Sequence, residues 1–126
     1  MPVPKAVIAI AGGTGSGKTS IANCISAAFP DDVALLPHDA YYKHNPHLTY
    51  EERSQLNYDH PDAFDNDLFI AHLKALRAGQ PIERPVYNFS THLRETETVR
   101  VEPAAIIVVE GVLVLANPEL RALYDL

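Results

Sequence analysis

Cysteine is almost absent from this sequence, because Cys24 is the single one in 126 residues and no disulfide framework can form. Long apolar runs are also missing: Pro, Gly and charged residues interrupt every candidate for the roughly 18–20 residues of a membrane span. Residues 1–5 lack the basic start, apolar middle and cleavage site of a secretory signal. We therefore expect a cytoplasmic chain that does not interact with membranes.

Basic side chains are in deficit, with 10 Lys and Arg against 16 Asp and Glu, and the formal net charge is −6. A field of this sign repels polyanions, so we expect no nucleic-acid partner. One small triphosphate can still bind where backbone N–H groups, a lysine and a metal ion gather. Cys24 falls on an apolar helix stripe with Ile21, Ile25 and Ala28, which favours a core-packing role.

Buried-type strands alternate with amphipathic helices along the chain. Short apolar runs at 6–11, 33–36 and 104–109 predict strands, and the first of them is expected to be central. Helices are predicted at 20–29, 50–55, 65–78 and 118–124, and a surface hairpin at 85–89 and 96–101. This order predicts an α/β fold with a doubly wound, mainly parallel sheet in one domain, with a hairpin insertion at about 83–102.

A glycine-rich segment, GGTGSGKT at residues 12–19, satisfies the pattern G-x-x-x-x-G-K-[ST] between a predicted strand and helix. Such a loop turns backbone N–H groups toward phosphates, so we predict an ATP site. Lys18 would reach the outer phosphates as a catalytic residue, and Thr19 would bind Mg²⁺. The predicted cofactor-binding residues are Gly12, Gly13, Thr14, Gly15, Ser16, Gly17, Lys18 and Thr19. The alternative is a turn that only connects strand to helix.

Two acidic residues follow predicted strands: Asp39 comes after 33–36, and Glu110 comes after 104–109. In a doubly wound sheet these strand ends converge beside the phosphate loop. We predict that Asp39 is the general base and a metal-associated residue, and that Glu110 binds the metal or its water. A turn aspartate and a solvated strand-end glutamate are the alternatives.

Five segments together resemble one family of P-loop kinases. These are GGTGSGKT, HDAYYK at 38–43, NYDHPDAFD at 57–65, PVYNFSTHLR at 85–94 and VVEGVLVL at 108–115. In this order they resemble the uridine kinase, or uridine-cytidine kinase, family. The resemblance implies phosphorylation of the 5′-hydroxyl of uridine or cytidine by ATP and Mg²⁺, a step of pyrimidine salvage. It also implies that Asp39 activates this hydroxyl and that Asp59 binds the other sugar hydroxyls.

The resemblance extends to the nucleoside base. It implies that Tyr87 and His92 address the pyrimidine ring, while Tyr58 and Phe89 wall the pocket. Aromatic faces suit a flat base, which agrees with this reading. Packing within the hairpin or the core is the alternative for Tyr58, Tyr87 and Phe89.

Members of the family continue past the length of this chain, through further strands and an arginine-bearing lid. We therefore expect the 126-residue polypeptide to be weakly active or inactive. The resemblance also implies a homo-oligomer, by analogy a tetramer. Alternatives are a phosphoribulokinase-like or pantothenate kinase-like enzyme, which PVYNFSTH argues against, or a noncatalytic ATP-binding fragment.

Overall fold

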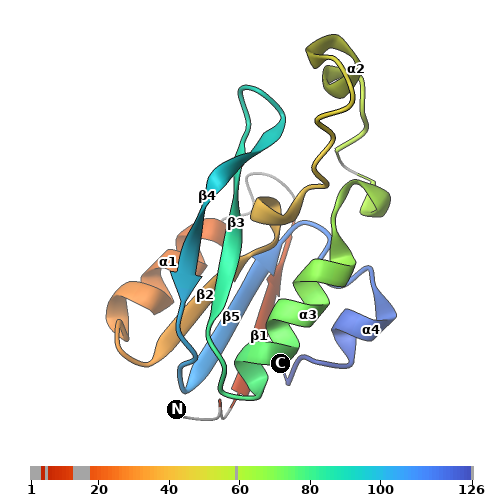
Figure 1. Ribbon diagram of the computed structural model, residues 1–126. Helices are drawn as coiled ribbons and strands as arrows, with labels where there is room; N and C mark the ends of the chain where they lie inside the picture. The colour runs from red at the N-terminus through yellow and green to blue at the C-terminus, as the bar shows by residue number, and fades with distance from the viewer. Residues whose placement is uncertain (1–3, 5, 13–17, 59, 126) are drawn as a thin grey trace.

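The computed structural model describes residues 4, 6–12, 18–58 and 60–125, and for residues 18 and 19 only the backbone. It is an α/β fold, as predicted, with helices on both faces of a parallel sheet (Figure 1). The sheet has the strand order β1-β5-β2, where β1 is Ala6–Ala11, β2 is Val33–Pro37 and β5 is Ile106–Gly111. No helix in the described part of the chain is long and apolar enough to cross a membrane.

The central strand is β5, so the prediction that residues 6–11 form it is wrong. β5 pairs in parallel with both neighbours, and Ile107, Val108 and Val109 have no exposed surface. In β1 only Val7 is fully buried. An apolar run predicts that a strand is covered on its faces, but it carries no information about which strand has a partner on each edge.

Alternate residues of the strands face the two helical layers. Val33 and Val108 pack with Ala22 and Ile25 of α1, which is Lys18–Ala28. The opposite face packs against α3, Asn66–Arg77, and α4, Pro118–Arg121. The larger core lies on this second side; its buried members include Leu36, Phe69, Leu73, Leu76, Ile107, Val109 and Leu120.

Cys24 is exposed, which corrects the prediction that it packs in the core. Of the predicted stripe, Ile25 packs toward the sheet together with Ala22, whereas Ile21 is 52% exposed. Successive residues lie about 100° apart around a helix axis, so the buried face is rotated away from Ile21 and Cys24 toward Ala22. Spacing alone could not fix this rotation.

Local signals placed the other helix starts correctly. Thr49 and Glu52 form both hydrogen bonds of a capping box at α2, Tyr50–Ser54. Asp65 caps α3, and Asn117 caps α4. Gly79 follows α3 with φ 80°, a conformation that glycine adopts at little cost.

The predicted hairpin is present and longer than expected. β3, Ile82–Asn88, pairs antiparallel with β4, Leu93–Val101. Polar cross-strand contacts extend it, because Glu83 accepts a hydrogen bond from Thr98 (3.0 Å) and lies 3.8 Å from Arg100. The hairpin turn and α2 both project beyond the end of the sheet at which β5 finishes (Figure 1).

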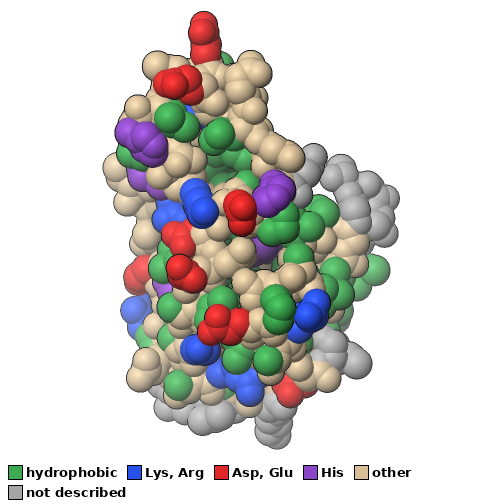
Figure 2. Space-filling model, turned by 90° about the vertical axis from the view of Figure 1, so that its right-hand side faces the viewer, with side chains coloured by type: hydrophobic (Ala, Val, Ile, Leu, Met, Phe, Trp, Pro, Cys, Tyr) green, Lys and Arg blue, Asp and Glu red, His purple; other side chains and the backbone are tan. Residues whose placement is uncertain are grey.

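Acidic and basic side chains are interspersed on the face that Figure 2 shows, around scattered apolar groups. Lys74 pairs with Glu119 at 3.4 Å, and Arg100 pairs with Glu102 at 2.5 Å. Both pairs are exposed and contribute little to stability.

Candidate functional site

The three parallel strands end together at the edge of the sheet where the phosphate loop was predicted. Glu110 of β5 is in register with Ile10 of β1 and with Pro37 of β2. β1 leads directly into Gly12, and β2 leads into the 3₁₀ turn His38–Tyr41 that contains Asp39. The convergence expected for Asp39 and Glu110 at this edge is therefore present in the backbone.

Most of the predicted phosphate loop lies outside the described residues. Gly12 is the part that the structure describes, whereas residues 13–17 and the side chains of Lys18 and Thr19 are not described. The backbone of Lys18 and Thr19 starts α1. Their assigned roles, and those of residues 13–17, stay predictions.

His38 anchors the turn that carries Asp39. Its ring is 1% exposed, stacks on Phe64 with a centroid distance of 3.9 Å, and bonds through Nε2 to Asn66 Oδ1 at 3.0 Å. Burial lowers the pKa of His38, so the ring is neutral at pH 7. The neighbouring Asp39 is half-buried, and the fixed ring limits how far its backbone can move.

The donor set at this edge suits magnesium better than a transition metal. The described residues contain no group of three His, Cys, Asp or Glu side chains that could hold a metal ion on its own. Mg²⁺ is usually bound by one or two carboxylates together with phosphate oxygens and water. Asp39 and Glu110 supply such carboxylates beside the end of β1, which fits Mg²⁺ bound jointly with a nucleotide.

An aromatic cluster centred on Tyr42 follows the Asp39 turn. The Tyr42 ring stacks on Phe64 at 4.5 Å, and it meets the edges or faces of three others: Tyr58 at 5.2 Å, Tyr87 at 5.1 Å and Phe89 at 6.2 Å. Three of the four predicted pocket residues are therefore gathered around a residue that sequence reasoning missed.

A signal for Tyr42 was present in the sequence. Tyr41 and Tyr42 are adjacent after a buried strand, and neighbouring side chains in a tight turn cannot both enter the same core. Tyr41 is fully buried, and its hydroxyl contacts His72 Nδ1 at 2.6 Å. Tyr42 is left to face the site.

His92, the fourth predicted pocket residue, lies at the hairpin turn. It is the non-glycine residue with positive φ (57°) among the described residues, a conformation that often marks functional positions. Its ring stacks on Tyr58 at 5.0 Å and 16°, with Tyr50 at 5.8 Å. Asn88 shapes the turn, because its Oδ1 accepts hydrogen bonds from the Ser90 and Thr91 amides.

Tyr87 combines burial with an unused polar group. It is 7% exposed, and burial raises the pKa of its hydroxyl. This hydroxyl lies close to Tyr58, whose own hydroxyl donates instead to the Arg53 carbonyl at 2.9 Å. The Tyr87 hydroxyl has no hydrogen bond of good geometry to any described residue. A buried group of this kind is costly unless a ligand or water satisfies it. Phe89, at 60% exposed, is the open side of the cluster.

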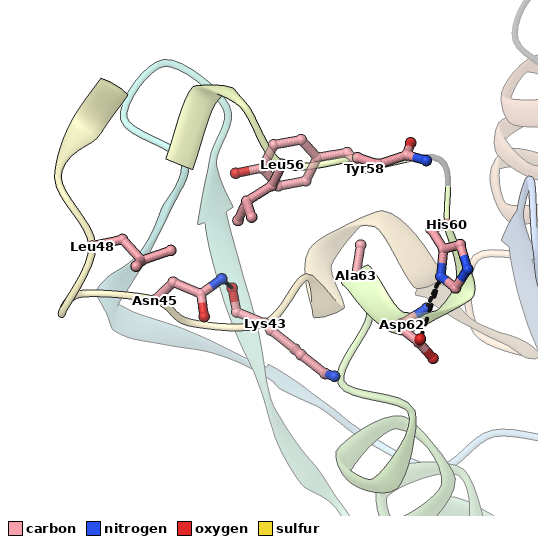
Figure 3. A pocket seen from close by; sticks show the side chains of 9 residues that line it. Lys43, Asn45, Leu48, Leu56, Tyr58, His60, Asp62 and Ala63 are labelled. Atoms are coloured by element: carbon pink, nitrogen blue, oxygen red, sulfur yellow. Dashed lines mark hydrogen bonds and ion pairs between the residues drawn. The ribbon is translucent and has the colours of Figure 1, made fainter. Parts of the chain in front are cut away.

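A cavity of about 330 Å³ adjoins the cluster and shares Tyr58 with it. Figure 3 shows Leu48, Leu56 and Tyr58 along one part of its wall, and the polar ends of His60 and Asp62 along another. Its volume falls in the range of small-molecule sites. Asp59, the predicted sugar-binding residue, lies outside the described residues, so its role stays a prediction.

The fold is that of a P-loop kinase. Its strand order is β1-β5-β2, a glycine-rich segment links β1 to α1 in the sequence, and acidic residues stand at the strand ends. Solved structures share this fold. A possible uridine kinase from Bacillus stearothermophilus matches with a TM-score of 0.71 at 20% identity, over 99% of this chain and 70% of that chain. D-glycerate 3-kinase from Cryptococcus neoformans matches with a TM-score of 0.57 at 23% identity, over 88% and 44%.

The chain belongs to the phosphoribulokinase / uridine kinase family, whose sequence profile matches residues 7–126. Uridine kinase of Streptococcus thermophilus is 47% identical over 127 aligned positions, which cover 100% of this chain and 60% of that protein. Uridine kinase of Streptococcus pneumoniae is 47% identical over 121 positions, which cover 95% and 57%. The chain thus spans about three fifths of the length of these curated relatives.

Proposed function

We propose that this chain carries the acceptor site and the phosphate loop of a kinase that moves the γ-phosphoryl group of ATP to the 5′-hydroxyl of uridine or cytidine, producing UMP or CMP. The observation that carries the proposal is an aromatic cluster beside the turn that holds Asp39. Tyr42 directly follows this turn, the Tyr58 and Tyr87 rings gather around Tyr42, and the His92 ring stacks on Tyr58. Stacking on aromatic rings is a general way to hold a nucleic-acid base. The 47% identity to proteins named uridine kinase supports the same acceptor.

In the proposed reaction the base lies against the aromatic rings, which directs the attached ribose toward the strand ends. Asp39 then accepts the proton of the 5′-hydroxyl as the hydroxyl oxygen attacks the γ-phosphorus; the bond from that phosphorus to the bridging β-phosphate oxygen breaks, and ADP leaves. Asp59 would accept hydrogen bonds from the remaining sugar hydroxyls. Phosphoryl transfer depends mostly on such positioning, because the transition state makes few covalent demands on the protein.

The nucleotide side of the site would use the segment between β1 and α1. The backbone amides of residues 12–17 would surround the phosphates, and Lys18 would contact the outer ones. Thr19, Asp39 and Glu110 would hold Mg²⁺ directly or through water. When bound, this ion neutralises charge on the transferring group.

The test is phosphoryl transfer from Mg-ATP to uridine, cytidine, pantothenate and ribulose 5-phosphate. It is run with this chain and with the chain extended by the remaining portion of a relative. With the extended chain, transfer to the two nucleosides alone is expected. Asp39→Asn should abolish it while ATP still binds, because the base is lost but the phosphate loop is kept.

Asp67→Asn is the matched control, since Asp67 is an exposed carboxylate in the first turn of α3. It should leave transfer unchanged. Preferred transfer to pantothenate or to the sugar phosphate would contradict the proposed acceptor. Full activity of Asp39→Asn would contradict the proposed base.

A further inference from the structure

Helix α2 buries one side chain against the rest of the protein. Arg53 is the buried residue of this five-residue helix, with 8% of its surface exposed. Tyr50, at the start of the helix, is 54% exposed, and Leu56, just after it, is 38% exposed. A helix this short has no stability of its own in water. Its position therefore depends on what Arg53 contacts.

The contacts of Arg53 reach three segments. Its Nε donates to the Thr91 carbonyl in the hairpin turn at 3.0 Å, and its Nη1 donates to the Leu48 carbonyl ahead of α2. Its own carbonyl accepts the hydroxyl of Tyr58 at 2.9 Å. One residue thus connects the approach to α2, the chain that leaves it and the turn of the β3–β4 hairpin.

These contacts converge on the two rings that stack on each other. Thr91 directly precedes His92, the residue with positive φ, and Arg53 adds a contact from outside to a turn that Asn88 shapes from within. Tyr58 is held through its hydroxyl, which donates to the Arg53 carbonyl, and its ring lies 5.0 Å from that of His92 with 16° between the planes. The guanidinium of Arg53 holds the turn ahead of His92, and the carbonyl of the same residue holds Tyr58, so a displacement of α2 would move the support of both rings.

We propose that Arg53 is the positioning residue of the nucleoside pocket, where its guanidinium bridges α2 to the hairpin turn and so holds His92 and Tyr58 in the arrangement that receives the base. This inference rests on the proposed function. An arginine suits the task because its planar fork donates in two directions at fixed angles, which a lysine ammonium does not reproduce.

The experiment compares Arg53→Met and Arg53→Lys with the matched control Arg77→Met. Arg77 also donates to a distant carbonyl, that of Leu123, but it lies in the last turn of α3. NMR records the ring protons of His92, which the Tyr58 ring shifts upfield when the two stack. Calorimetry records uridine and Mg-ATP affinity. If Arg53 only stabilised the fold, Arg53→Met and Arg77→Met would give the same spectra and the same affinities.

In Arg53→Met we expect the upfield shift to disappear and uridine affinity to fall about tenfold, with Mg-ATP affinity unchanged. Arg77→Met should retain both the shift and the affinity. The proposal is overturned if Arg53→Met retains the shift or binds uridine as tightly as the unchanged chain. The proposal is also overturned if Arg53→Lys keeps both the His92 shift and the uridine affinity of the unchanged chain. A positive charge without the planar guanidinium would then be sufficient to position His92.

The proposed function is judged separately, on the unchanged chain. If that chain binds Mg-ATP but no nucleoside, the proposed acceptor is wrong. The His92 spectrum of Arg53→Met then still decides whether Arg53 positions this ring.

Discussion

Gly111, the last residue of β5, lies against His38: a Cβ on Gly111 would come within 2.7 Å of the His38 Cβ and within 3.1 Å of Val114 Cγ1. Real Cβ atoms do not approach this closely, so the contact requires a glycine. It sets the distance between the central strand and the turn that carries Asp39. The position directly after Glu110 thereby helps to define the geometry of both acidic residues.

Gly111→Ala should therefore destabilise the fold by about 1–3 kcal/mol, because the backbone of the turn has to move to admit one methyl group. Urea unfolding followed by circular dichroism measures the loss. Ala11→Ser is the control, since Ala11 is the exposed register partner of Gly111 on β1 and also gains one heavy atom. Equal stability of Gly111→Ala and the unchanged chain would contradict the close contact.

The two carboxylate oxygens of Asp65 make separate contacts, and two substitutions can distinguish their contributions to stability. Oδ1 accepts the Leu68 amide as the N-cap of α3, and Oδ2 pairs with Arg94 Nη2 at 3.0 Å. Asp65→Asn removes the ion pair but keeps a capping oxygen, whereas Asp65→Ala removes both. We expect the alanine variant to be less stable than the asparagine variant by about 1 kcal/mol in urea unfolding. Equal losses would mean that the cap contributes nothing.

The capping box of α2 should be sensitive to acid. The hydrogen bond from the Thr49 amide to Glu52 Oε1, at 2.9 Å, is the main cause that holds the Glu52 pKa below its ordinary 4.5. A depressed folded-state pKa adds stability that is complete above the unfolded value and is lost as the pH falls through the folded value. We thus expect amide protection in α2 to decrease below about pH 4.5.

An NMR titration of the Glu52 side chain measures this directly. In Thr49→Ala the side-chain partner is lost and the backbone donor remains, so the Glu52 pKa should rise part of the way toward its ordinary value. Glu51→Gln, which alters an exposed neighbour outside the box, should leave it unchanged. An unaltered Glu52 pKa in Thr49→Ala would show that the Thr49 hydroxyl does not contribute to the shift.

Tyr87→Phe separates stability from binding. The hydroxyl is buried and makes no good hydrogen bond within the described chain, so its removal should leave the free energy of unfolding unchanged or raise it by up to about 1 kcal/mol. If the hydroxyl serves the nucleoside, uridine affinity should fall about fivefold at the same time. Thermal unfolding and calorimetry on one sample measure both. Unaltered affinity would remove Tyr87 from the polar recognition of the base.

Helix starts could be predicted from the sequence because each depends on a few neighbouring residues. The start of α2 is specified by the capping box of Thr49 and Glu52. The start of α3 is specified by its N-cap Asp65, and Gly79 follows its end. The order of the strands is a different matter. Whether β1 or β5 is central depends on pairings between residues 73 and 100 positions apart, and both strands read as short apolar runs.

The candidate site shows the same division. Asp39 and Glu110 could be placed because parallel strands end at one edge of a sheet. The adjacency of Tyr41 and Tyr42 indicated only that one of the two rings faces outward; the partners of Tyr42, which are Phe64, Tyr87 and Phe89, come from other elements and could not be predicted. Arg53 gave no signal either, since an arginine in the sequence EER reads as solvated until Thr91 is seen beside it.

The outer edge of β1 is occupied where the strand begins. Val7 donates its amide to Asp125 Oδ2 and accepts the Asp125 amide, both at 2.7 Å. Any polypeptide that docks along this flank, from the same molecule or a different one, must first displace Asp125 or bind closer to Ala9. Asp125 thus covers the first part of this strand edge, and we expect its replacement by alanine to raise the propensity to self-associate.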